Sequence, residues 1–119
     1  MNITLWVIQG LLAAMFIMAG MMKAFQYEKA KEKLPWVKDV SKGLVTFIGI
    51  SELLGGIGLI APQATGILPI LTPVAAIGLS VIMLLAARFH LSRKEMPGVI
   101  TNLVILVLAA FVAYGRLSL

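Results

Sequence analysis

A lone acidic residue, Glu52, stands inside the apolar, glycine-rich run G-I-S-E-L-L-G-G-I-G-L-I-A-P at residues 49–62. A charged group at the centre of a bilayer costs about 2.5–3.5 kcal/mol on insertion scales, so such groups face the protein interior and have partners there. One interpretation of Glu52 is a polar clamp that holds helices together. The other is a site for a ligand or a proton inside the protein, because ionisable groups within membranes are usually functional.

The depth of other polar residues ranks the partners that Glu52 could have. Lys23, at the end of the first apolar segment, ranks first as an ionic partner because its long side chain can extend inward. Asn102 and Ser80 rank next as hydrogen-bond partners, since they lie at comparable depths in later apolar segments. His90, in the run R-F-H-L-S-R-K-E, is either an interfacial histidine or a group that donates a proton or binds the head of a lipid or quinone.

The composition excludes several kinds of catalytic site. The chain has no cysteine and a single histidine, which excludes disulfides, thiol catalysis and cysteine-ligated metals and leaves too few ligands for a protein metal site. The sequence contains no phosphate-binding loop and no nucleophile–base pair. We therefore expect no metal, and the sequence assigns no catalytic residue.

Long apolar segments must position these residues. The chain is 61% hydrophobic and 13% charged, whereas a soluble domain is close to half apolar and about a quarter charged. A bilayer-spanning helix needs about 20 mostly apolar residues. We predict one transmembrane domain over residues 1–119, an all-α, four-transmembrane-helix bundle with antiparallel up-down connectivity. Its helices are expected at residues 3–25, 43–61, 66–89 and 97–117.

The basic residues predict the orientation of this bundle. Of the ten Lys and Arg residues, only Arg116 lies on the side of the chain termini. The other nine lie on the opposite side, which includes the loop 26–42. The net charge of +5 therefore reflects membrane topology rather than nucleic-acid binding. We predict both termini outside and the charged loops in the cytoplasm. Gln9 and Arg116 are then expected at the outer membrane interface, and membrane lipids are expected partners.

Glycines predict where the first two helices meet. Gly49, Gly55 and Gly56 lie three or four residues from Glu52 and share its helical face, and Gly20 lies on a small-residue stripe of the first segment. Small residues allow two helix backbones to approach closely. We therefore predict that these helices pack tightly, with the carboxyl group in or beside the contact. Exposed glycine faces would also allow the protein to form a homo-oligomer or to bind a membrane-protein partner.

The connections carry further local signals. The run P-Q-A-T-G at 62–66 predicts a tight turn between antiparallel neighbours, because proline and glycine end helices. Pro73, inside the third predicted helix, should kink that helix or free a backbone carbonyl. In the loop 26–42 we predict a short charged helix and then an interfacial stretch of Leu34, Trp36, Val37 and Val40, with Trp36 at headgroup level.

The ordered set of motifs resembles the DoxX-like family of small four-helix membrane proteins. The matching runs are A-G-M-M-K at 19–23, L-P-W-V-K-D-V at 34–40, the glycine-rich run at 49–62, F-H-L-S-R-K-E at 89–95 and N-L-V-I-L-V-L-A-A-F-V-A-Y-G-R at 102–116. The resemblance implies a four-helix bundle, which we expect in a bacterial inner membrane. By motif it carries Lys23, Glu52, His90 and Asn102 over as a candidate pocket, without giving them catalytic roles.

Three functions stay open at this point. The first is a protein that binds a lipophilic small molecule or serves as an accessory subunit for a membrane partner. The second is a quinone-linked membrane oxidoreductase subunit, in which Glu52 or His90 exchanges protons with a quinone while a partner supplies the redox centre. The third is a small transporter or proton path, which would need to oligomerise. We expect the first, with a quinone or a lipid as the candidate ligand.

Overall fold

The computed structural model describes residues 2–118, which form helices and no strands. Each of the four long helices is apolar and long enough to cross a membrane. A short helix, α2, and a 3₁₀ helix, η1, connect the first two of them. The bounds are α1 (Asn2–Phe25), α2 (Tyr27–Lys33), η1 (Pro35–Asp39), α3 (Lys42–Thr65), α4 (Leu71–Ser92) and α5 (Met96–Ser118). The predicted all-α membrane bundle is confirmed.

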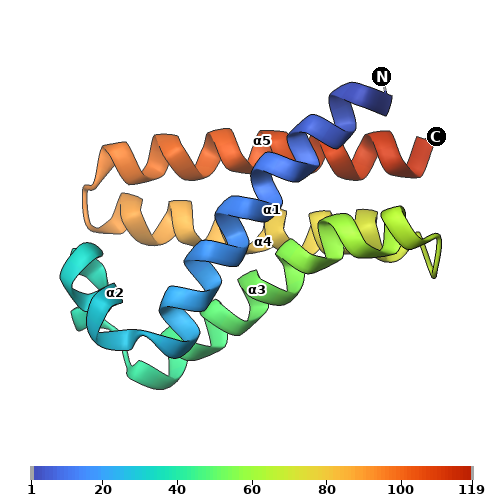
Figure 1. The fold of residues 1–119 in the computed structure, drawn as a ribbon. Helices are drawn as coiled ribbons and strands as arrows, with labels where there is room; N and C mark the ends of the chain where they lie inside the picture. Colours follow the sequence, from blue (N-terminus) through green and yellow to red (C-terminus); the bar gives the residue numbers. More distant parts are fainter. Residues whose placement is uncertain (1, 119) are drawn as a thin grey trace.

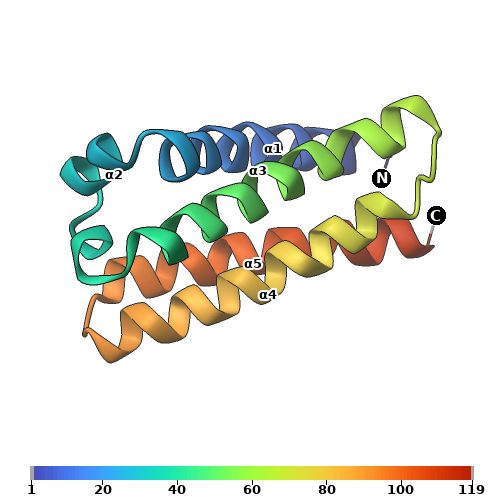
Figure 2. The ribbon, with the colours of Figure 1, turned by 90° about the horizontal axis from the view of Figure 1, so that it is seen from below.

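The long helices form two antiparallel pairs. In Figures 1 and 2, α1 lies beside α3 and α4 lies beside α5, and the pairs cross at an angle, meeting mainly through α3 and α4. The start of α1, the end of α5 and the α3–α4 turn lie at one end of the bundle, and we call this the outer end. The charged helix α2 and the α4–α5 turn lie at the opposite, inner end. This arrangement matches the up-down connectivity predicted above.

Apolar side chains point both into the bundle and away from it. Phe16, Leu59, Leu79 and Val112, one from each long helix, are buried in a common core. Large apolar side chains also cover the outer faces of all four helices. A helix that is hydrophobic all round is typical of a membrane span. The packing therefore agrees with a bundle whose outer surface contacts lipid.

Glycines bring α1 and α3 into backbone contact. A Cβ atom placed on Gly20 would lie 2.6 Å from the carbonyl oxygen of Gly49, and one on Gly49 would lie 2.5 Å from the backbone nitrogen of Ala24. Gly56 faces Ile17 of α1 in the same way. Gly55 instead faces Leu79 of α4, so this glycine serves the contact between the two pairs. The tight packing predicted for the first two spans is confirmed.

The α3–α4 turn differs from its prediction. Helix α3 continues through Pro62 to Thr65 and ends at Gly66, whose left-handed φ of 73° suits glycine. The predicted turn at 62–66 is therefore wrong for all but its last residue. Pro73 lies in the first turn of α4, where backbone N–H groups have no acceptor within the helix. The kink or freed carbonyl predicted at Pro73 is wrong for this reason.

Side chains from other helices compensate for proline inside α3. Pro62 has no N–H, so the carbonyl of Gly58, four residues earlier, loses its helical donor. The Thr72 hydroxyl from α4 donates to this carbonyl at 3.0 Å. The neighbouring carbonyl of Leu59 accepts a hydrogen bond of 2.6 Å from the side-chain amide of Gln9 in α1. The helix break expected at Pro62 is thus prevented by donors that lie far away in the sequence.

This arrangement predicts that Thr72 and Pro62 are energetically coupled. Thr72→Val should lower the free energy of unfolding by about 0.5–1 kcal/mol, because the carbonyl of Gly58 loses its donor. In a Pro62→Ala background the new backbone N–H can replace that donor, so the same substitution should cost much less. Thermal unfolding of the four proteins in mild detergent measures both losses. Equal losses in the two backgrounds would show that the hydroxyl does not compensate for the proline.

Candidate functional site

Glu52 forms a buried ion pair with Lys23. The Lys23 Nζ donates to the Glu52 Oε1 at 2.7 Å, and the two side chains are 12% and 3% exposed. Lys23 lies near the inner end of α1 and reaches back toward the middle of α3. A Cβ atom on Gly49 would lie 2.8 Å from the Lys23 Cβ, so the glycine contact and the ion pair occupy the same helix seam. The pairing ranked first from the sequence is confirmed, while a ligand at Glu52 stays a prediction.

The pair places no net charge inside the bundle. Two opposite charges in contact cost less to bury than one alone, because their attraction offsets part of the lost hydration. Removing one partner of such a pair leaves the other charge buried without compensation. The contact therefore ties the position of α1 to that of α3.

Trp36 covers the inner end of this ion pair. The Lys23 Nζ lies 5.5 Å from the centroid of the Trp36 ring, a distance at which a cation and an aromatic ring attract each other. The same ring meets Phe89 and His90 of α4 edge-on, at centroid distances of 5.8 and 6.3 Å. Trp36 is half-buried, and Val37 is fully buried. The interfacial position predicted for Val37 is wrong, because η1 turns this side chain toward Ala30 and Val45.

An ionic cluster fastens η1 to the α4–α5 turn. The Arg93 guanidinium donates to Asp39 of η1 at 2.8 Å and to Glu95 at 3.1 Å. The same Glu95 oxygen lies 2.8 Å from the Nδ1 of His90. The hydrogen bond with His90, aided by Arg93, holds the pKa of Glu95 below its ordinary value. The contact with Asp39 raises the pKa of Arg93 further above its ordinary range.

The remaining predicted residues do not meet Glu52. The Ser80 hydroxyl donates to the carbonyl of Ala76 in its own helix at 2.8 Å. Asn102 is half-buried on α5, and within residues 2–118 no hydrogen bond joins Asn102 or Ser80 to Glu52. The structure therefore brings Lys23 and Glu52 together and places His90 in the separate inner cluster. A ligand pocket that includes all five residues stays a prediction.

A polar network at the outer end was not anticipated. Gln9 is 0% exposed, and its Oε1 accepts a hydrogen bond of 2.6 Å from the Arg116 Nε. The Arg116 Nη1 donates to Asn2 at 2.8 Å, and the guanidinium lies 5.1 Å from the Trp6 ring. The interfacial position predicted for Gln9 is wrong, because its amide lies inside the bundle and donates to the Leu59 carbonyl. Arg116 packs against α1 and joins it to α5.

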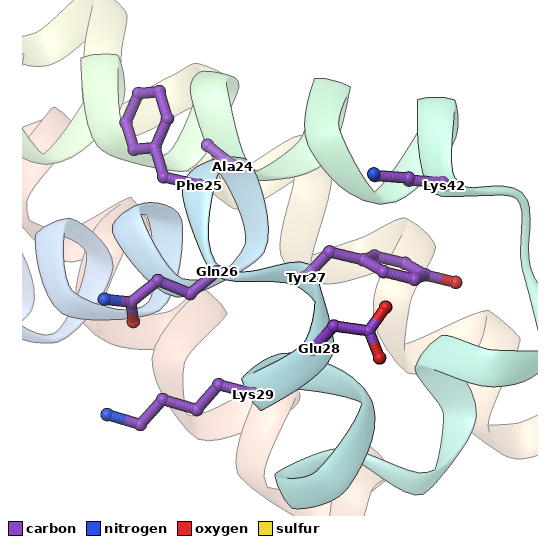
Figure 3. A pocket seen from close by; sticks show the side chains of 7 residues that line it. All are labelled: Ala24, Phe25, Gln26, Tyr27, Glu28, Lys29 and Lys42. Carbon is purple, nitrogen blue, oxygen red and sulfur yellow. The ribbon is translucent and has the colours of Figure 1, made fainter.

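Two cavities lie on the surface of the bundle, away from Glu52. A groove of about 410 Å³ runs between α3 and α4 from Ser51 to Pro62, and a depression of about 460 Å³ lies where α1 meets α2 (Figure 3). Glu52 lines neither of these two cavities. Across the part of the chain that the structure describes, no three His, Asp or Glu side chains are grouped so that they could hold a metal ion.

These features define a small integral membrane protein whose helix bundle is closed by polar contacts in its centre and at both ends. The chain matches the model of the DoxX-like family over residues 7–112, which is most of its length. It therefore belongs to the DoxX-like family, and the resemblance noted from its motifs is confirmed. No curated protein and no solved structure gives a significant match to the chain.

The buried pair predicts a strong coupling between Lys23 and Glu52. Glu52→Gln and Lys23→Met should each lower the free energy of unfolding by about 3–5 kcal/mol, because each leaves a polar or charged partner buried alone. The double variant should lose far less than the sum of the two. Unfolding in mild detergent measures this cycle, with Lys94→Met, an exposed lysine on the α4–α5 turn, as the control. Losses that simply add would show that the two side chains do not stabilise the fold as a pair.

The ionic cluster of Asp39, His90, Arg93 and Glu95 predicts that the fluorescence of Trp36 changes at low pH. Because the pKa of Glu95 is lowered, its carboxylate contributes at neutral pH, and this contribution is lost only as the pH falls below the ordinary glutamate value of about 4.3. Trp6→Phe leaves Trp36 as the single tryptophan. Its fluorescence emission should shift to the red below that pH, and Glu95→Gln should remove this shift. A red shift at low pH that Glu95→Gln leaves unchanged would contradict this role of Glu95.

Proposed function

We propose that this protein is an accessory membrane protein that holds a lipophilic molecule in the groove between α3 and α4. The observation that carries the proposal is the lining of this groove. Small residues form much of it, and larger apolar side chains and one hydroxyl border it. The small residues are Gly55, Gly58, Ala75 and Gly78, and the others include Ser51, Leu54, Val74 and Ile82.

The groove suits a long apolar chain. Its volume of about 410 Å³ is within the range of about 300–1,000 Å³ that small-molecule sites occupy. The stretch from Ser51 to Pro62 corresponds to roughly 16 Å of helix. A Cβ atom on Gly78 would meet nothing within 4 Å, so the protein leaves this position open. A hydrocarbon or isoprenoid chain could lie here and enter sideways from the bilayer.

The ion pair gives the groove its position. Ser51 lines the groove, whereas Glu52, the next residue, faces α1 and binds Lys23. By fixing α3 against α1, the pair sets which face of α3 is left for α4 and the ligand. The ligand site predicted at Glu52 itself would be separate from this groove, and it predicts that Glu52→Gln loses a molecule that Gly78→Leu retains. The proposal places the protein in a bacterial inner membrane, with its termini outside.

Filling the groove should displace the ligand. Gly78→Leu puts a large side chain into the groove without a clash, because the position is open. Gly10→Leu is the matched control, since Gly10 also has nothing within 4 Å and lies on α1 outside the groove. Both proteins and the wild type are purified in mild detergent from native membranes, and mass spectrometry identifies the molecules that co-purify.

We expect one lipophilic molecule in the wild type and in Gly10→Leu, and its loss in Gly78→Leu. The same occupancy in all three proteins would contradict a site in the groove. If the retained molecule is a quinone, the quinone-linked subunit becomes the preferred form of the proposal. If no protein retains any small molecule, the binding function is wrong.

A further inference from the structure

The turn between α3 and α4 is apolar, although it lies at one end of the bundle (Figure 1). Residues 67–71 are I-L-P-I-L, and the side chains of Ile67 and Leu68 are 70% and 63% exposed. Turns in water usually carry polar residues, and several exposed apolar residues in a row indicate contact with another apolar surface. The α4–α5 turn at the inner end has the opposite character, because residues 93–95 are R-K-E. The composition of the α3–α4 turn is therefore not that of a segment surrounded by water.

The length of α4 places this turn near the edge of the hydrocarbon core. Residues 53–87, which include the turn, carry no charge. From Leu71, where α4 begins, to Arg88 the helix rises by roughly 26 Å. The hydrocarbon core is about 30 Å thick, and a tilted helix crosses less of it than its own length. With Arg88 at the inner headgroups, α4 begins at or below the opposite boundary of the core, and the turn lies at that level too.

The backbone of the turn forms hydrogen bonds within the turn itself. The N–H of Ile67 donates to the Thr65 hydroxyl at 3.3 Å, and the N–H of Leu71 donates to the Leu68 carbonyl at 2.9 Å. Pro69 has no N–H. Backbone groups that are shielded from water must find partners inside the protein. These bonds therefore suit a turn that lies where little water reaches it.

The conformation of Leu68 points in the same direction. Its φ of 48° is left-handed, a region that glycine and asparagine adopt more readily than leucine. A large exposed apolar side chain adds to this cost in water, whereas transfer of the side chain into hydrocarbon offsets it. Lys94 in the α4–α5 turn has a similar φ of 59° and is exposed. The conformation alone therefore does not require an apolar residue.

We propose that the α3–α4 turn is immersed in the membrane and that its binding partner is the acyl-chain region of the leaflet at the outer end. Ile67, Leu68 and Ile70 insert among the upper parts of the acyl chains. They continue the exposed apolar surface of α3 and α4, which includes Leu54 and Val74. The turn would thus anchor this helix pair in the leaflet. This inference does not depend on whether the groove between α3 and α4 binds a ligand.

Single cysteines can test the immersion, because the chain has no cysteine of its own. Ile67→Cys and Leu68→Cys each place a nitroxide label in the turn. Lys94→Cys is the matched control, since Lys94 has the same left-handed conformation in the turn at the inner end, and Ile77→Cys, exposed on α4, is the lipid reference. Each protein is reconstituted into phosphatidylcholine vesicles, and circular dichroism checks that it is folded. Electron paramagnetic resonance then measures how often the label collides with oxygen, which concentrates in hydrocarbon, and with a water-soluble nickel complex present on both sides of the membrane.

We expect collisions with the nickel complex to be at least about threefold rarer at Ile67 and Leu68 than at Lys94, because moving a polar complex into an apolar layer is costly. Collisions with oxygen should approach those at Ile77. Nickel collisions as frequent as at Lys94 would place the turn in water and overturn the proposal. Few collisions with either reagent would mean that protein, such as a second copy of this chain, covers the turn, and this result would overturn it as well.

Discussion

Two opposite charges held 2.7 Å apart in an apolar interior constrain the rest of this bundle. The carboxylate of Glu52 can be buried in the middle of α3 only because an ammonium group reaches it from α1. That contact requires the two helices to approach closely, and Gly20 and Gly49 remove the side chains that would keep them apart. With α3 fixed against α1 in this way, the neighbouring face of α3, which carries Ser51 and Gly58, is left to form the groove with α4.

The two ends of the bundle are closed by different chemistry. At the outer end, neutral donors from α1 and α4 satisfy the carbonyls next to Pro62, and Arg116 extends this network to α5. At the inner end, Trp36 lies over Lys23, and the ion pair between Asp39 and Arg93 attaches η1 to α4. Polar contacts thus join the helices at both ends and in the centre, while the faces between them remain apolar. Helices joined in this way can keep their positions while the groove between α3 and α4 stays open to lipid.

Local and periodic signals made much of this structure predictable. The four spans follow from the length of the apolar segments, and the pairing of Lys23 with Glu52 follows from their depths and from the glycines beside them. Contacts that depend on how separate helices meet were not predictable in the same way. Gln9 resembles an interfacial residue in sequence, and only the fold shows that it donates to Leu59, fifty residues away. Trp36 likewise finds its partners on α4 through a turn whose direction no local pattern reveals.

Measuring the charge state of Glu52 tests the ion pair most directly, because every role assigned to the contact between Lys23 and Glu52 requires an ionised carboxylate. Infrared difference spectra between the wild type and Glu52→Gln, recorded in lipid bilayers at neutral pH, isolate the signal of this one side chain. We predict that the substitution removes the bands of a carboxylate and changes nothing in the region of a protonated acid. A protonated acid in the wild-type protein would contradict an ion pair at the centre of the fold.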